Sequence, residues 1–120
     1  MTHSYVVAAE ARDDIRGILI WSQQHFGDQI RDAYEELIFA GLSDVASDPM
    51  RVGSHAEPEL GATVRSWHLA LSREHVASQV RRIKSPRHFV IYRAGSDEVT
   101  ILRILHDAMN LPAARIPSAR

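Results

Sequence analysis

The feature that most constrains the fold is a change of hydrophobic period part-way along the chain. Up to about residue 47, apolar residues recur every three or four positions, and from Val64 onward they alternate with polar ones. The first period is typical of helices with one buried stripe, and the second is typical of half-buried strands. A helical first half followed by a run of strands predicts an α+β domain.

Two helices are expected in the first half, separated only by Gly27 and Asp28. The first begins at Ala8 and continues to Phe26. Gly27 is suited to end it as a C-cap, and Asp28 is suited to begin the next helix as an N-cap. The second helix ends before Pro49. Because helices joined by so short a connection lie antiparallel, we expect a helical hairpin.

A short strand is expected at 4–7, ahead of the helices, and three more follow them. In chain order, these later strands are predicted at 64–71, 88–93 and 99–106. A loop rich in Pro and Gly fills 49–63, and a polar, basic connection with room for a helical turn fills 72–85. The sheet needs a cover for its apolar face, and the helical hairpin is the only candidate. The expected domain is therefore a two-layer βααβββ fold with a mainly antiparallel sheet.

The length of 120 residues is that of one domain. We expect this domain to span 1–110 and the tail 111–120 to be weakly ordered. The absence of cysteine excludes disulfides and thiol chemistry and fits a reducing cytosol. The first residues lack the segments of an export signal, and no apolar run reaches the roughly 20 residues of a membrane helix. We therefore expect a cytoplasmic protein with no membrane partner.

The two halves of the chain differ in charge, although the net charge is only −1. Residues 1–60 contain four Arg against eleven Asp and Glu, a net of −7. Residues 61–120 contain nine Arg and one Lys against four Asp and Glu, a net of +6. Two interpretations remain open. Either the basic half meets an acidic partner, or the halves neutralise each other in the folded protein.

No motif predicts a metal site, a cofactor or a nucleophile. Three of the seven histidines, His68, His88 and His106, fall on predicted strands, but none has the close spacing of a metal-binding pair. The sequence contains neither a glycine-rich phosphate loop nor a Gly-x-Ser-x-Gly elbow. The acidic residues lie mainly on the predicted helices, where they form solvated faces. We therefore expect no cofactor, no metal and no catalytic residue from these motifs.

The apolar run Val99–His106 and the residues after it carry a family resemblance. The run ends in Arg-Ile-Leu-His and is followed by Asp-Ala-Met-Asn at 107–110. Five further segments precede it in matching order: Phe26-Gly27, Tyr34 with Leu37, Asp48-Pro49, Arg65-Ser66-Trp67-His68 and 86–93. Over roughly 5–110 the chain resembles the ParE branch of the RelE/ParE toxins. These proteins are the toxin halves of bacterial type II toxin–antitoxin pairs.

The resemblance implies an inhibitor of DNA gyrase that blocks the enzyme with its DNA cleaved. This activity needs a binding surface and no catalytic residue, and the basic half of the chain is suited to supply the surface. The candidates for contact with the target are Arg65, Arg93, Arg103 and His106. Arg103 is the strongest of them, because an arginine centred in an apolar strand is either paired or used in function.

Two alternative functions remain open. RelE-type relatives are ribosome-dependent mRNA endonucleases, and such cleavage needs a proton acceptor, cations and a donor to the leaving oxygen. This chain has arginines and His106 near the right strands, but it lacks the closely spaced lysines and the C-terminal tyrosine typical of those nucleases. The other alternative is a toxin fold without activity that serves as a binding module.

The resemblance also implies a cognate antitoxin as protein partner, with a toxin–antitoxin hetero-oligomer as a usual assembly. Antitoxin tails wrap such toxins as an amphipathic helix, sometimes with an added strand, and engage the helical hairpin and the sheet. The apolar stripe of the helices is mainly core, and part of it is expected to face this groove. The groove candidates are Ile15, Leu19, Tyr34, Leu37 and Ile38.

One segment departs from the family pattern. Many ParE-like chains join the Arg-x-x-His strand to the next strand by a tight turn. Here about fourteen residues intervene, and they include Arg73, Arg81, Arg82 and Lys84. This basic connection is either a local variation of the surface or an added contact element.

Overall fold

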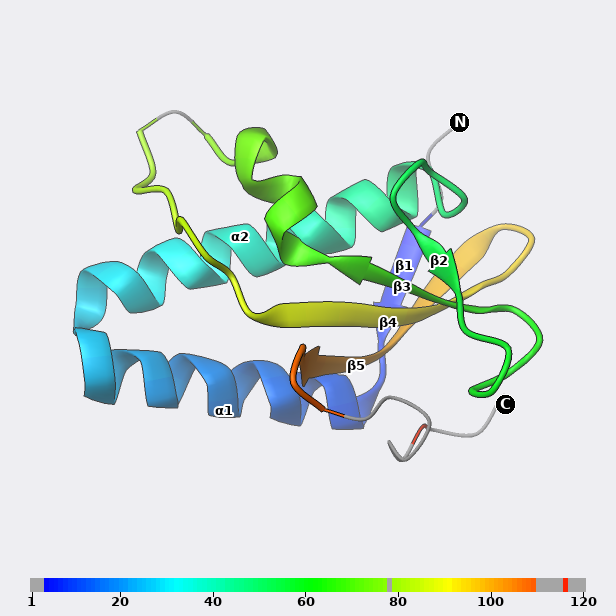
Figure 1. The fold of residues 1–120 in the computed structure, drawn as a ribbon, viewed down its shortest axis with the longest axis horizontal. Helices are drawn as coiled ribbons and strands as arrows, with labels where there is room; N and C mark the ends of the chain where they lie inside the picture. The colour runs from blue at the N-terminus through cyan, green and yellow to red at the C-terminus, as the bar shows by residue number, and fades with distance from the viewer. Residues whose placement is uncertain (1–3, 78, 110–115, 117–120) are drawn as a thin grey trace.

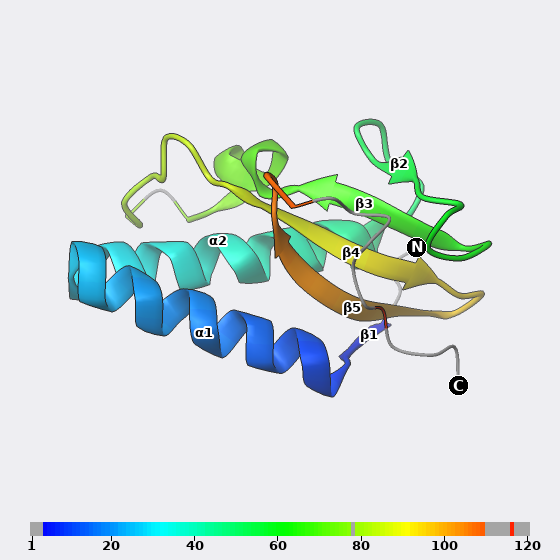
Figure 2. The same cartoon turned by 60° about the horizontal axis from the view of Figure 1, so that its bottom comes forward.

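The computed structural model describes residues 4–77, 79–109 and 116. The domain has two layers, a sheet and a helical hairpin that covers one of its faces (Figures 1 and 2). The sheet has five strands in the order β1-β5-β4-β3-β2. In the described part of the chain, no helix is long and apolar enough to cross a membrane.

The elements follow one another in this order: β1 (Ser4–Val7), α1 (Ala9–Phe26), α2 (Asp28–Ser47), β2 (His55–Ala56), β3 (Val64–His68), the 3₁₀ helix η1 (Leu69–His75), β4 (His88–Ala94) and β5 (Glu98–His106). Strands β3, β4 and β5 form an antiparallel meander, and β1 pairs with β5 in parallel. The prediction of a two-layer α+β fold with a helical hairpin is confirmed. The two-residue β2, which pairs with β3, lies within the segment predicted as loop.

The hairpin turns at Gly27, whose φ of 88° lies in the region that favours glycine. Its N–H donates to Gln23 O and closes α1. The N-cap of α2 is also Gly27, so the prediction of Asp28 as N-cap is wrong. Asp28 is already helical, and its carboxylate accepts a 2.8 Å hydrogen bond from the Gln23 side chain. Its charge still lies at the positive end of α2, where an acidic residue stabilises a helix.

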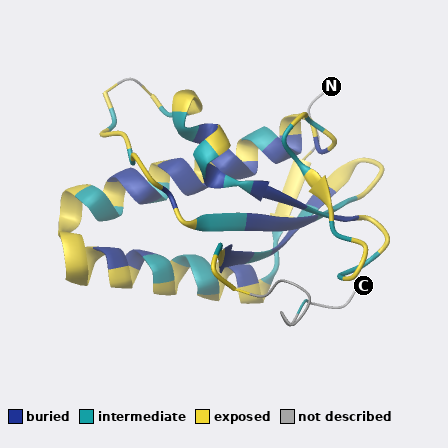
Figure 3. Cartoon of the chain, viewed as in Figure 1, coloured by how far each residue is buried: buried dark blue, intermediate teal, exposed yellow. Residues whose placement is uncertain are grey.

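The main core lies between the sheet and the hairpin. Helix α2 supplies most of the helical side of it, and its core residues Leu37, Ile38, Leu42 and Val45 are at most 1% exposed. The sheet contributes Trp67, Val90, Tyr92 and Ile101. Figure 3 shows burial concentrated on α2 and the central strands, while the turn of the hairpin is exposed. The hairpin therefore extends past the core with one end uncovered.

A second apolar cluster covers the other face of the sheet. It contains Val64, Ile91, Leu102 and Leu105, with Leu60, Phe89 and Ile116 packed against it. Strand β5 is therefore buried on both faces, which explains its nearly continuous apolar sequence. The expectation of a weakly ordered tail falls, apart from Ile116, on residues outside the described part of the chain.

The predicted strand 64–71 ends early, at His68. The His68 ring Nδ1 accepts a 3.0 Å hydrogen bond from the backbone N–H of Ala70, which caps η1 and turns the chain. Leu69 is then fully buried against α2, at a point where a Cβ on Gly41 would clash with it. The alternating leucines Leu69 and Leu71 fit the pattern of a strand. The spacing of apolar residues does not reveal that a side chain caps a helix at this point.

A chain of hydrogen bonds fastens η1 to α2. The indole N–H of Trp67 donates to Ser72 Oγ at 2.8 Å, and the Ser72 hydroxyl donates to Asp44 Oδ2 at 2.6 Å. Ser72 is fully buried. The bonds join the end of β3 and the middle of η1 to the C-terminal part of α2, so they hold η1 against that helix.

Ser72→Ala should lower the free energy of unfolding by about 1–2 kcal/mol, because the buried Trp67 N–H then has no acceptor. Urea denaturation followed by circular dichroism measures the change. Ser47→Ala, at an exposed position at the end of α2, is the matched control and should change the value by less than about 0.5 kcal/mol. Equal effects of the two substitutions would contradict a stabilising role for the hydrogen-bond chain.

Candidate functional site

A groove of about 740 Å³ opens between the helical hairpin and the end of the sheet. Its apolar side is formed by Ile18 and Trp21 of α1, Phe26 at the end of α1 and Ile30 of α2. Trp21 is 52% exposed and Phe26 is 61% exposed. Several large apolar side chains exposed together mark an interaction surface on a small domain, whereas a single one does not.

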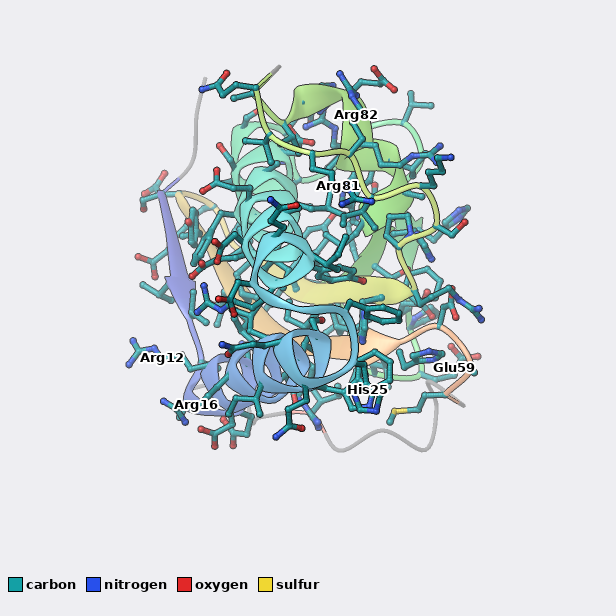
Figure 4. The ribbon with its side chains drawn as sticks, turned by 90° about the vertical axis from the view of Figure 1, so that its left-hand side faces the viewer. Arg12, Arg16, His25, Glu59, Arg81 and Arg82 are labelled. Carbon is teal, nitrogen blue, oxygen red and sulfur yellow. The ribbon has the colours of Figure 1, made fainter. Side chains whose placement is uncertain are left out.

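The opposite wall of the groove is a segment between η1 and β4, residues 79–87, which we call the basic arm. Four cationic residues of the basic arm line the groove: Arg81, Arg82, Lys84 and Arg87. Figure 4 faces the turn of the hairpin and shows Arg81 and Arg82 on the arm beside α2, with His25 below them beside α1. The basic connection noted in the sequence therefore forms a wall of the groove.

The basic arm is held in place by hydrogen bonds with η1 and by the core. The Arg73 guanidinium donates to Lys84 O at 2.6 Å, and the Arg82 guanidinium donates to Arg73 O at 2.8 Å. Arg82 also pairs with Glu74 at 2.8 Å. Ile83 packs against the main core cluster, and the arm is thereby anchored on its inner side. The arm presents its charges from a fixed position.

Tyr34, His88 and His106 close the groove at the sheet. The Arg87 backbone N–H donates to Tyr34 Oη at 3.2 Å, so the Tyr34 hydroxyl proton is free to be donated to His88 Nδ1 at 2.7 Å. The His88 and His106 rings meet edge to face with centroids 5.3 Å apart. Burial, then the neighbouring His106, lowers the pKa of His88 to about 4, and burial raises the pKa of Tyr34 to about 12. Both groups are therefore neutral at neutral pH.

Asp107 joins the ends of the strands beside the groove. Its carboxylate accepts from Arg87 at 3.0 Å and from His68 Nε2 at 3.0 Å, and its backbone N–H donates to Arg87 O at 2.8 Å. Hydrogen bonds from Arg87 and then His68 lower the pKa of the Asp107 carboxyl to about 2. The carboxylate stays charged and balances Arg87, which leaves other cations of the basic arm to face a partner.

A model of the family described as the ParE toxin of the type II toxin–antitoxin system, parDE, matches residues 5–111. The chain belongs to the ParE toxin family. It is a toxin of a type II toxin–antitoxin system, and the resemblance found in its sequence is confirmed.

The fold of this ParE-family chain is similar to that of a solved toxin–antitoxin system. The chromosomal ParDE system from P. aeruginosa matches with a TM-score of 0.62 and 13% identity, over 88% of this chain and 96% of that one. The toxin–antitoxin complex RelBE2 from Mycobacterium tuberculosis matches with a TM-score of 0.49 and 23% identity, over 88% of this chain and 99% of that one. No curated protein matches the chain.

The structure separates the four residues predicted to contact the target of this ParE-family toxin. Arg65 donates to Ser54 Oγ at 2.8 Å and holds the loop before β3. Arg93 is partly exposed near the hairpin end of β4, and His106, 48% exposed, lines the groove at the other end of the sheet. Arg93 and His106 therefore lie at opposite ends of the β4–β5 pair.

Arg103, the strongest of these candidates, lies at the edge of β5 beside α1. Its guanidinium makes two hydrogen bonds to the Asp14 carboxylate, at 2.7 and 3.0 Å. The backbone N–H of Ile104 donates to the same carboxylate at 3.0 Å. Strand β1 pairs with β5 only as far as Ile101, so Asp14 satisfies an edge N–H that no strand reaches. The expectation that Arg103 is either paired or functional is met by pairing.

The five residues predicted to face an antitoxin divide between core and groove. Leu19, Leu37 and Ile38 are buried in the main core, and Ile15 is partly buried against it. Only Tyr34 lines the groove. The groove residues on α1 that the prediction missed are Gly17, Ile18, Trp21, Ser22 and Phe26. The available signal was the pair of large aromatic residues close to a glycine within a helix.

Proposed function

We propose that this ParE-family toxin inhibits DNA gyrase and that a cognate antitoxin neutralises it by covering the groove. The observation that carries the proposal is the groove itself, which is preformed and apolar and exposes Trp21 and Phe26 to solvent. A protein partner bound in the groove would remove this apolar surface from water. Membership of the ParE family supports gyrase as the target.

The sheet arginines differ in how well their charges suit contact with gyrase and its bound DNA. Arg65 donates to neutral oxygens of Ser54, and no ion pair balances its positive charge within the described residues. Arg103 is balanced by Asp14. A phosphate or carboxylate of the target gains most from the uncompensated charge. We therefore propose Arg65 as the target contact to test first, with Arg103 in a structural role.

The test is supercoiling of relaxed plasmid by gyrase with increasing amounts of the purified toxin. We expect supercoiling to be lost and linear, cleaved DNA to accumulate. Arg65→Gln should weaken inhibition by about tenfold, as expected for loss of one charge-assisted contact. Arg16→Gln removes a solvent-exposed arginine from α1 and is the matched control.

Two results would overturn the gyrase proposal. One is unchanged supercoiling at micromolar concentrations of the folded toxin. The other is shortening of ribosome-bound transcripts by the same preparation, which would place the target on the ribosome. The antitoxin half of the proposal is tested by the protein encoded next to this gene, which should restore supercoiling when added at equal concentration.

A further inference from the structure

We infer that the groove of the free toxin is also a binding site for a small nucleoside phosphate, whose base packs on Trp21 and whose phosphate accepts from Arg81 and Lys84. The inference goes beyond the proposed function, which assigns no small molecule to the groove. Four features of the groove support it: a buried hydroxyl without a partner, a set of unpaired hydrogen-bond donors, an exposed aromatic ring and a volume suited to one small ligand.

The first feature is the hydroxyl of Ser22 on α1. Ser22 lines the groove, yet it is only 4% exposed. Within the described residues its hydroxyl makes no hydrogen bond, whereas those of the two other buried serines, Ser66 and Ser72, donate to carboxylates. A buried hydroxyl without a partner destabilises a fold. At the wall of a groove, a bound ligand can supply the missing partner.

The second feature is the set of cations on the basic arm. Four cationic residues line the groove, and none of its lining residues in the described chain is acidic. Two of the cations, Arg82 and Arg87, are paired with carboxylates. For the side chains of Arg81 and Lys84, the described residues supply no hydrogen bond or ion pair. Two uncompensated cations on one wall favour an anionic ligand.

His106 adds a further donor at the sheet end of the groove. Its ring Nδ1 accepts a 3.1 Å hydrogen bond from the backbone N–H of Ala108, so the neutral ring carries its proton on Nε2. No described residue accepts from this Nε2, and the side chain is 48% exposed. The three oxygens of a phosphate point in different directions. They therefore suit donors on separate walls better than the two coplanar oxygens of a carboxylate do.

The third feature is an aromatic ring that is held in position before any ligand binds. The Trp21 indole stacks on the His25 ring with centroids 4.1 Å apart and meets the Phe26 ring edge to face at 5.6 Å. Trp21 nevertheless stays 52% exposed. A flat nucleobase stacks on an exposed ring of this kind. Ile18 and Ile30 complete the apolar side of the groove around it.

The fourth feature is the size of the groove. Its volume of about 740 Å³ lies within the range of small-molecule sites. A single strand of nucleic acid needs instead a track of positive charge along several nucleotides. Here the unpaired cations Arg81 and Lys84 lie on one wall, and the net charge of the chain is −1. The ligand is therefore a free nucleotide, and a strand is an outcome that the test can return.

The test is calorimetric titration of adenosine monophosphate (AMP) into the full chain, with adenosine and inorganic phosphate as separate titrants. AMP should bind with a Kd on the order of 10–100 µM, as expected for a ligand of its size. Adenosine and phosphate should each bind at least about tenfold more weakly, because each meets only one part of the groove. Phosphate binding as tight as that of AMP would show an anion site alone and overturn the nucleotide.

The charge test uses Arg81→Gln with Lys84→Gln, which should weaken AMP binding by about tenfold or more and leave adenosine binding unchanged. The matched control, Arg12→Gln with Arg16→Gln, removes the same number of charges from α1. Figure 4 shows both control residues away from the basic arm. The control should bind AMP within about twofold of wild type at physiological salt, which screens distant charges. Equal losses in the two variants would overturn a local phosphate site.

The stacking test uses Trp21→Ala, which should weaken the binding of both AMP and adenosine by about tenfold. Trp21→Phe retains an aromatic ring and should recover most of that loss. Ile20→Ala is the matched control, since Ile20 is a 50% exposed apolar residue of α1 that does not line the groove. Equal affinity of wild type and Trp21→Ala for AMP would overturn the placement of the base.

Ser22→Ala gives a readout that a purely structural role would not give. Because the buried hydroxyl has no partner in the described chain, the variant should resist urea at least as well as wild type. It should also bind AMP about threefold to tenfold more weakly. Lower stability with unchanged affinity for AMP would assign the hydroxyl to the fold and contradict its role in the site.

The remaining outcomes separate this inference from the proposed function. If AMP does not bind the folded toxin, the inference is overturned, while gyrase inhibition and neutralisation by the antitoxin stand. If AMP binds but saturating AMP leaves antitoxin binding unchanged, the nucleotide site stands and the proposed place of the antitoxin in the groove fails. A short single-stranded oligonucleotide that binds about a hundredfold tighter than AMP, and loses this advantage in Arg81→Gln, Lys84→Gln, would assign the groove to a strand and overturn the free nucleotide.

Discussion

Replacing Asp14 with alanine should lower the free energy of unfolding by about 2–3 kcal/mol. The substitution leaves the Arg103 guanidinium without its carboxylate and the Ile104 N–H without an acceptor. The Arg103 and Asp14 side chains are 21% and 17% exposed. Because water still reaches the pair, the loss should be smaller than the roughly 3–5 kcal/mol of a fully buried one.

The neighbouring residue provides the control. Asp13 pairs with Arg16 at 3.0 Å, but its side chain is 73% exposed, so Asp13→Ala should cost less than about 0.5 kcal/mol. The double substitution Asp14→Leu with Arg103→Met should recover much of the loss, because no charge is then left unpaired at the strand edge. Chemical denaturation of the four proteins measures these differences. Equal effects at Asp13 and Asp14 would show that the Arg103 pair is solvated and would return Arg103 to the target-binding candidates.

Protonation of His88 should also lower the free energy of unfolding by about 3 kcal/mol as the pH drops from about 6.5 to about 4. Burial lowers the pKa of His88 from 6.5 to about 4, with a further lowering by His106 and a smaller opposing effect of Asp107. Between these two pH values the unfolded chain binds a proton that the folded chain does not. Stability therefore rises with pH across this interval.

His88→Asn tests this pH dependence without removing the acceptor for the Tyr34 hydroxyl, because an amide oxygen can take the place of Nδ1. The variant should lose less stability than wild type between pH 6.5 and 4. His55→Asn, at an exposed position on β2, is the matched control. Urea unfolding at each pH gives the profile. Parallel profiles for wild type and His88→Asn would contradict a neutral, buried His88.

Asp107 affects stability in a lower pH range, which keeps its contribution separate. Hydrogen bonds from Arg87 and His68 lower the pKa of its carboxyl from 3.8 to about 2. A carboxyl with a lowered pKa stabilises the fold above its unfolded value, so this contribution is complete above about pH 4 and is lost as the pH falls toward 2. The His88 interval lies above this range.

The helices and the meander of strands were predictable because each is specified by local patterns. The 3.6-residue period, the Gly27 turn and Pro49 define a helical hairpin, and the alternation after Val64 defines strands. The errors lie where a side chain overrode the pattern. The His68 ring caps η1 and ends β3 three residues before the alternation stops. The spacing of apolar residues cannot predict this side-chain hydrogen bond.

The ion pair between Arg103 and Asp14 shows how much the sequence predicts about the surroundings of a single residue. An arginine in an apolar strand has to be balanced or used, so the sequence implied that Arg103 has a partner. The sequence could not identify that partner, because Asp14 lies 89 positions earlier in the chain. The pairing depends on α1 packing against β5 beyond the end of β1, and that packing is a property of the folded domain.

The sequence by itself determined the fold class, the family and the presence of a basic segment between the strands 64–71 and 88–93. Only the tertiary structure decided which surface that segment borders. Tyr34, Leu37 and Ile38 are all buried on one helical stripe, yet only Tyr34 also lines the groove. The physical reason is that hydrophobic period reports which side of a helix is apolar. Whether that side is covered depends on how far the sheet extends beneath it, and here the hairpin reaches past the sheet and leaves Trp21 and Phe26 exposed beside the basic arm.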